Sequence, residues 1–239
     1  MKKIAKLTVA MGLCCGIASV VLAVADQATR QARQVAEKRD KMTALAQVLP
    51  TFDPKAELEE KRFLVKDASG QEREVIFHLL RKADGVVGLA GECSTTRGYG
   101  GRINLLAGIT DEGKIRAIVV MEHRETPGLG AILLERQARK TLSDAFHAGK
   151  EAGAVKALPP CPYLDQYNGR SLDGSAKFQV QKAAAKVSAT TGATKTYRAA
   201  TDAGQAIDAV TGATITSRAV ADAIQSLADA FAAHREELR

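Results

Sequence analysis

Arg102-Ile-Asn-Leu-Leu-Ala-Gly-Ile-Thr110 is followed by the turn Asp111-Glu-Gly113 and then by Lys114-Ile-Arg-Ala-Ile-Val-Val-Met-Glu-His123. In the first arm, apolar side chains occupy every second position, which is the period of a strand with one buried face: Ile103, Leu105, Ala107 and Ile109. The second arm is rich in β-branched residues and almost continuously apolar, which is typical of a central strand. The sequence therefore predicts an antiparallel hairpin within a sheet.

Shorter apolar stretches before the hairpin extend this sheet. Residues 62–66, 74–80 and 86–90 are separated by the turn-like sequences Asp67-Ala-Ser-Gly70 and Lys82-Ala-Asp-Gly85. Apolar runs between such turns predict further antiparallel strands.

Helices are predicted after the hairpin. Near the end of the chain, one apolar stripe recurs at helical spacing: Val220, Ile224, Leu227 and Phe231. A further helix is predicted after Gly130, with these residues facing inward: Leu133, Ala138 and Leu142. The segment 149–182 is rich in loop residues, and three aromatic residues are its predicted anchors: Tyr163, Tyr167 and Phe178. The predicted fold class is α+β, one antiparallel sheet with helices packed on it.

The N-terminal segment predicts a membrane anchor. Leu7–Ala25 contains no charged residue and is about 28 Å long as a helix, close to the apolar thickness of a bilayer. A cleaved signal peptide is the alternative, because Ala23-Val-Ala25 before Asp26 resembles a cleavage site. We favour the anchor because the apolar run exceeds the usual signal core. The predicted organisation is a cytoplasmic N-terminus (1–6), a transmembrane anchor (7–25), a helical stalk (26–50) and an extracytoplasmic domain (51–239).

Composition argues against a nucleic-acid partner and against a metal centre. The formal net charge is +7, but Lys2, Lys3 and Lys6 supply three of those charges, and the remaining basic residues are mixed with acidic ones. Aromatic residues make up 4% of the chain and tryptophan is absent, which disfavours a base-stacking surface. The four histidines are scattered and show no metal-ligand spacing.

Two of the four cysteines lie outside the apolar segment that contains Cys14 and Cys15. Cys93 and Cys161 either form one disulfide or remain two free thiols, and their spacing is compatible with both. No Cys-x-x-Cys sequence occurs, which disfavours a redox dithiol.

The sequence Asp208-Ala-Val-Thr-Gly-Ala-Thr214 precedes the predicted C-terminal helix. A glycine-containing turn that presents a hydroxyl at a helix start can hold a phosphate, because backbone N–H groups and the helix dipole both favour an anion there. Asp208 could orient the hydroxyl of Thr214 or bind Mg²⁺ that accompanies a phosphate. The alternative is a simple turn with a helix N-cap.

A second Thr-Gly-Ala-Thr sequence is the weaker candidate. At Thr191-Gly-Ala-Thr194, Ser188 stands where Asp208 stands before Thr214, and no clear apolar stripe follows. We therefore predict Thr214, and not Thr194, as the functional threonine.

The sequence His123-Arg-Glu-Thr-Pro-Gly-Leu-Gly130 is a candidate second wall of the same site. Gly128 and Gly130 allow the backbone to approach a flat ligand, with Thr126 against its polar edge and Leu129 against its face. The alternative is a tight connection between strand and helix, with Glu125 as a cap that faces solvent.

Together these motifs resemble the G subunit of the Rnf ion-translocating electron-transport complex and the related C subunit of the sodium-pumping NADH:quinone reductase. The resemblance extends over nearly the whole chain and rests on these segments: Gly98-Tyr-Gly-Gly-Arg-Ile103, Glu125-Thr-Pro-Gly-Leu-Gly130, Tyr163-Leu-Asp-Gln-Tyr-Asn-Gly169 and Asp208 to Ser217. It implies a periplasmic FMN-binding domain on an inner-membrane anchor, in which a separate flavin transferase joins FMN through its phosphate to Thr214.

The resemblance also implies a role and a set of cofactor-binding residues. The flavin would carry electrons between other subunits of a ferredoxin:NAD-type oxidoreductase that pumps ions. The chain would be a redox carrier without an acid–base active site of its own, because flavin chemistry belongs to the cofactor. The implied flavin-binding residues are Asp208, Thr211, Gly212, Ala213, Thr214, Thr216, Glu125, Thr126, Gly128, Leu129 and Gly130.

Two other functions remain open. The chain could be a membrane-anchored structural or binding subunit without flavin, or its FMN domain could serve a different respiratory reductase.

Overall fold

The computed structural model describes residues 2–49, 57–66, 70–82, 85–136, 158–174, 177–181 and 205–238. The Thr191–Thr194 sequence and most of the helix predicted after Gly130 lie outside these residues. The chain divides into two compact units, Met1–Met42 and Thr43–Arg239.

Helix α1 runs without a break from Lys2 to Val48. Its apolar part has a mean hydropathy of 2.3 and none of it is buried, so by length and composition this helix can cross a membrane. Val20, Leu22 and Val24 are among its exposed apolar side chains. Water is a poor solvent for such a surface, and lipid is a good one.

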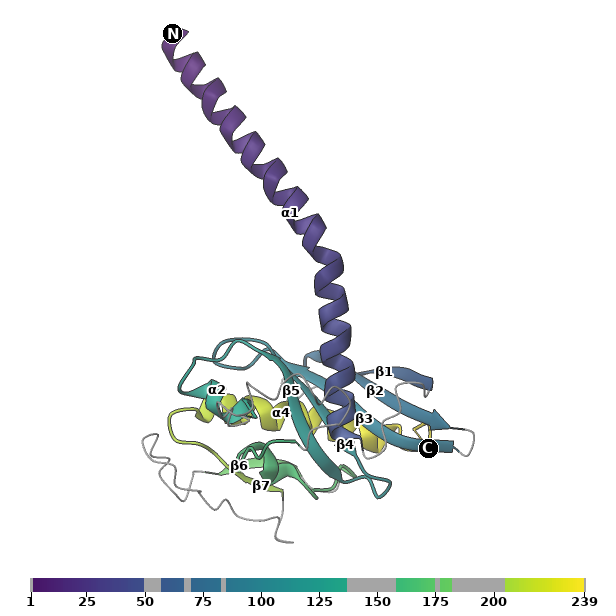
Figure 1. Cartoon of the computed structure of the whole chain (residues 1–239). Helices are drawn as coiled ribbons and strands as arrows, with labels where there is room; N and C mark the ends of the chain where they lie inside the picture. The colour runs from purple at the N-terminus through teal and green to yellow at the C-terminus, as the bar shows by residue number, and fades with distance from the viewer. Residues whose placement is uncertain are drawn as a thin grey trace, which may run out of the picture. The chain divides into compact units, whose positions relative to one another are not determined.

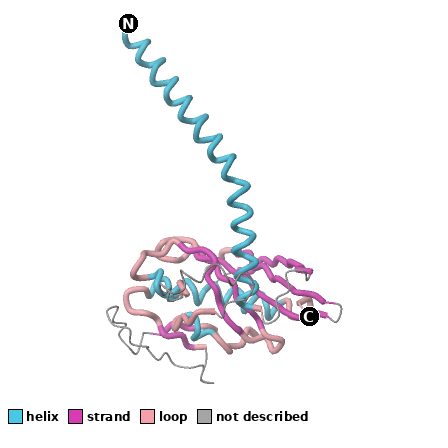
Figure 2. The backbone as a smooth tube through the Cα atoms, viewed as in Figure 1, coloured by secondary structure: helices cyan, strands magenta, loops and turns pink. Residues whose placement is uncertain are grey.

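The second unit contains a five-stranded antiparallel sheet in which each strand pairs with the next in sequence (Figures 1 and 2). Its strands are β1 (Glu57–Lys66), β2 (Glu72–Lys82), β3 (Gly85–Thr95), β4 (Ile103–Ile109) and β5 (Ile115–His123). Strands β4 and β5 form the predicted hairpin, with Leu105 opposite Val120. The α+β class is confirmed.

Helix α4 (Thr214–Ala233) covers one face of the sheet (Figure 1). All four residues of its predicted apolar stripe are buried, and so are the alternate residues of β4 that face it: Val220, Ile224, Leu227, Phe231, Ile103, Leu105, Ala107 and Ile109. The apolar face of α4 and the apolar face of β4 therefore belong to one core. Because residues along the whole of α4 are buried, the same core holds its first turn in place.

The end of α1 packs on the opposite face of the sheet. Leu45, Val48 and Leu49 form a second core with Leu80 and Leu106. Gly108 makes room for this helix end, since a Cβ atom there would collide with the Val48 carbonyl. The compact unit consequently begins at Thr43, whereas the sequence predicted a stalk that ends at residue 50.

The remaining elements are short. They are α2 (Gly130–Leu134), the 3-10 helix η1 (Leu164–Tyr167), and the strands β6 (Gln179–Gln181) and β7 (Ala206–Asp208). Strands β6 and β7 pair in parallel, an addition to the single antiparallel sheet that was predicted (Figure 2). The three aromatic anchors, Tyr163, Tyr167 and Phe178, are buried as predicted.

Candidate functional site

Two turns of the same geometry face each other at the start of α4. In Thr126–Leu129, the Leu129 N–H donates to the Thr126 carbonyl at 3.2 Å, and Gly128 at the third position has φ +81°. In Val210–Ala213, the Ala213 N–H donates to the Val210 carbonyl at 3.0 Å, and Gly212 has φ +91°. Positive φ at the third position is the requirement of a type II turn, and glycine meets it without strain. A Cβ atom on Gly212 would lie 3.6 Å from the Leu129 side chain, so the turns are neighbours.

Three hydroxyl groups lie in the first turn of α4, and two of them are used for structure. The Thr216 hydroxyl donates to Glu125 Oε2 at 2.8 Å. The Ser217 hydroxyl donates to the Ala213 carbonyl at 3.0 Å and accepts from the Val210 N–H at 3.3 Å. Thr214 is exposed, and its hydroxyl makes no hydrogen bond with any residue that the structure describes.

Thr214 does not cap the helix. Ala213 occupies the N-cap position, without a side-chain hydrogen bond, and Thr214 is the first helical residue. The capping explanation for the threonine is therefore wrong. Its oxygen stands at the positive end of a 20-residue helix, where an anion is stabilised by the helix dipole and by unpaired N–H groups.

Glu125 joins the two sides of the site from a buried position. Its carboxylate accepts from the Thr216 hydroxyl through Oε2 and from the Gly100 N–H, at 3.2 Å, through Oε1. Only 5% of the residue is exposed, so the alternative of a solvent-facing cap is wrong. Its bonds connect the Gly98–Gly101 loop, the turn after β5 and the first turn of α4.

A cavity of about 380 Å³ lies between these elements. The residues that line it are Tyr99, Glu125, Thr126, Leu129, Gly130, Gly212, Ala213, Thr214, Ile215 and Thr216. Its size falls within the range of small-molecule sites. Tyr99, Leu129 and Ile215 are 70%, 54% and 53% exposed, which is unusual for large apolar or aromatic side chains and gives a flat ligand apolar surfaces to cover.

Most of the predicted site residues meet at this cavity. Eight of its ten lining residues were predicted, four of them within Glu125–Gly130 and four within Gly212–Thr216. Gly128 shapes one turn without lining the cavity, and neither Asp208 nor Thr211 lines it. Tyr99 and Ile215 belong to the lining but were not predicted.

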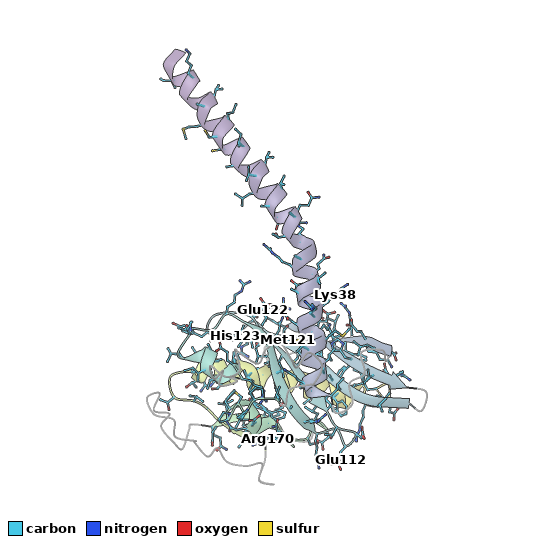
Figure 3. The ribbon with its side chains drawn as sticks, viewed as in Figure 1. Lys38, Glu112, Met121, Glu122, His123 and Arg170 are labelled. Atoms are coloured by element: carbon cyan, nitrogen blue, oxygen red, sulfur yellow. The ribbon has the colours of Figure 1, made fainter. Side chains whose placement is uncertain are left out.

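Asp208 is tied into β7 through its backbone. The Gln166 amide accepts from the Asp208 N–H at 2.8 Å and donates to its carbonyl at 3.3 Å. The nearby Arg170 donates to the carbonyls of Gln166 and Ala206. Burial lowers the pKa of Arg170, and the negative charge of Asp208 opposes that shift. Figure 3 labels Arg170, which lies well away from His123 at the end of β5. Asp208 thus contributes to the support of the site.

Two buried tyrosines hold the first turn of α4 in place from the interior of the domain. The Tyr163 hydroxyl donates to the Ser217 carbonyl at 2.9 Å and lies 3.2 Å from the Tyr167 hydroxyl. Since a phenol has one proton to donate, Tyr167 is the donor of that second bond. Burial raises the pKa of Tyr167 well above its ordinary value, so it keeps its proton.

Cys93 and Cys161 are free, buried thiols, which decides between the two alternatives left open by the sequence. The Cys161 thiol donates to the Leu133 carbonyl at 3.2 Å. Burial raises the pKa of Cys93 from 9.0 to about 12 and also raises that of Cys161.

These thiols should resist alkylation while the protein is folded. Only the thiolate reacts, so iodoacetamide at about pH 8 should label Cys93 and Cys161 rapidly in denaturant and slowly without it, as measured by peptide mass. Because the folded pKa of Cys93 is raised, its contribution to stability is complete below pH 9.0 and is lost as the pH rises towards about 12. Equal labelling rates in the folded and unfolded protein would contradict this burial.

Comparisons with known proteins agree on one family. The family model described as FMN-binding domain matches residues 98–206 and 200–229. The chain is 37% identical over 123 residues to the G subunit of the ion-translocating oxidoreductase complex of Stutzerimonas stutzeri, and the match covers 50% of this chain and 51% of that protein. It is 30% identical over 195 residues to the G subunit of the complex of the same name from Cereibacter sphaeroides, with 79% and 75% covered.

The chain thus spans about half the length of the first relative and three quarters of the second. Among solved structures, Shewanella oneidensis NqrC matches with a TM-score of 0.44 and 17% identity, over 78% of this chain and 70% of that one.

Proposed function

The chain belongs to the FMN-binding domain family and, within it, to the G subunits of ion-translocating oxidoreductase complexes, and on this premise we propose that it is an electron-transfer subunit that carries FMN esterified to Thr214. The observation that carries the proposal is the Thr214 hydroxyl. Of the three hydroxyl groups in the first turn of α4, it is the one that forms no hydrogen bond with any described residue. Thr214 also lines the cavity at the positive end of α4.

The residues of the cavity fit the parts of FMN. Leu129, Ile215 and Tyr99 offer exposed apolar surface to an isoalloxazine ring. The start of α4 offers backbone N–H groups and a favourable dipole to a phosphate. Glu125 and Thr126 add polar groups to the lining, which suits the donors and acceptors at the edge of the ring.

Attachment requires an activated donor. The Thr214 oxygen forms a bond to phosphorus, the bond from phosphorus to the donor's leaving group breaks, and the hydroxyl proton leaves with the base that accepts it. A flavin phosphoanhydride is such a donor, and a separate flavin transferase would supply it. The exposed side chain of Thr214 is accessible to that enzyme, whereas the Thr216 and Ser217 hydroxyls are buried.

Bound FMN supplies one- and two-electron transfer, which no amino acid side chain in the cavity can perform. The protein supplies a fixed position and prevents loss of the cofactor. A covalent ester is useful for a domain outside the cytoplasm, where lost FMN would not be replaced. We further propose that α1 anchors the domain on the periplasmic side of the inner membrane. The partners would be the other subunits of a ferredoxin:NAD-type complex.

Denaturation of the protein, after coexpression with a flavin transferase, tests the proposal. The expected result is flavin fluorescence that stays with the polypeptide and a mass increase equal to FMN minus water, located by fragmentation on Thr214. Flavin that is released on denaturation would show a non-covalent site. A protein that contains no flavin would support the alternative of a structural subunit, and copurification with a different reductase would identify another electron-transfer partner.

A further inference from the structure

Arg218 is an exposed cation on the same helix face as Thr214. Both residues are exposed at the start of α4, while Thr216 and Ser217 between them are buried. Side chains four positions apart on a helix are neighbours, and each leans towards the helix N-terminus. An arginine at position 218 is therefore long enough and suitably placed to reach Thr214. It forms no hydrogen bond or ion pair with any residue in the described part of the chain.

The carboxylate that could have paired with Arg218 is engaged elsewhere. Asp222 lies one further turn along α4, but its Oδ2 accepts from Arg97 Nη1 at 2.8 Å. Arg97 comes from the loop after β3, so Asp222 binds that loop to the helix. An Arg–Asp pair in this order along a helix is also the weaker orientation for an ion pair.

The other arginines near the cavity have partners of their own. Arg124 lies 3.9 Å from Glu122, and Arg102 donates to the Asn104 amide oxygen at 2.8 Å. Among the residues that the structure describes, Arg218 is thus the arginine near Thr214 that remains available for an anion. Its planar group can donate two parallel hydrogen bonds, a geometry that suits phosphate.

We propose that Arg218 is a positioning residue that binds the phosphate of the flavin and thereby fixes the ester on the exposed edge of α4. The inference rests on the proposed attachment of FMN to Thr214. An ester at Thr214 leaves two phosphate oxygens that are not bonded to carbon and share one negative charge, and Arg218 donates to them. Without Arg218, only water and the helix dipole stabilise that charge.

Nitrogen and phosphorus NMR of the flavin-loaded protein test this contact. Arg218→Ala identifies the Arg218 Nε–H signal by its loss, and Arg124→Ala identifies that of Arg124, a second exposed arginine that directly precedes the cavity residue Glu125. Loading with FMN should shift the Arg218 signal and leave the Arg124 signal in place. The phosphorus resonance should move in Arg218→Ala, move less in Arg218→Lys, and stay unchanged in Arg124→Ala.

The outcomes separate the two proposals. A mass spectrum without flavin on Thr214 would overturn the proposed function and, with it, this inference. Flavin on Thr214 with an unshifted Arg218 signal and an unchanged phosphorus resonance in Arg218→Ala would overturn the inference alone. Since Arg218 is exposed and pairs with no described residue, its replacement by alanine should leave the thermal midpoint of the unloaded protein unchanged.

Discussion

Thr214→Val should abolish covalent flavin completely while it leaves the domain folded. Valine has the shape of threonine and a similar helix propensity, so the change removes the oxygen that would form the ester and little else. Because that hydroxyl has no hydrogen bond among the described residues, stability should change by less than about 0.5 kcal/mol. The measurement is the intact mass after coexpression with the transferase, together with a urea unfolding curve.

Matched variants show whether the effect belongs to this threonine. Thr211→Val changes a threonine in the Val210–Ala213 turn, just before Thr214, that does not line the cavity. Thr194→Val alters the second Thr-Gly-Ala-Thr sequence. Both should keep the full mass increase. Thr214→Ser keeps a hydroxyl at the same position and should retain attachment. Flavin on Thr214→Val, or its loss from Thr194→Val, would show that the assigned site is wrong.

The fold was predictable where apolar residues recur at one regular spacing along a whole helix or strand. Alternation in β4 and the stripe on α4 each specify a single buried face, and the two faces pack on each other. The end of α1 was predicted as stalk because Leu45, Val48 and Leu49 follow a polar, weakly periodic stretch. Their partners Leu80 and Leu106 lie on the second face of the sheet, and sequence alone does not show what covers that face. Three-residue strands such as β6 and β7 are too short to show a period.

The site was predictable as two motifs but not as a set of contacts. Glu125 and Thr216 are 91 residues apart, and no spacing rule pairs a carboxylate with a hydroxyl over that distance. Asp208 is close to Thr214 in sequence, yet its backbone bonds to Gln166. Ile215 could have been predicted as a lining residue. It does not belong to the apolar stripe of Val220, Ile224, Leu227 and Phe231, so an exposed position is expected for it. Tyr99 was visible as an aromatic residue among glycines in a chain with few aromatic residues.

Thr216→Val should have the opposite effects from Thr214→Val, although the two residues are neighbours on one turn. The change removes the donor to Glu125 Oε2 and leaves a buried carboxylate with the Gly100 N–H as its remaining hydrogen-bond donor among the described residues. An unsatisfied buried group of this kind costs about 2 kcal/mol. The unfolding free energy should fall by that amount in a urea unfolding curve, whereas Thr214 stays available and covalent flavin is retained in the intact mass.

The double variant Glu125→Gln/Thr216→Val tests the source of this loss. A neutral amide needs less compensation than a carboxylate, so the second change should cost less in the Glu125→Gln background than in the native one. Equal costs in both backgrounds would mean that Thr216 stabilises the domain by packing and not through Glu125. In that case, the carboxylate could not be what connects the turn after β5 to the helix that presents Thr214.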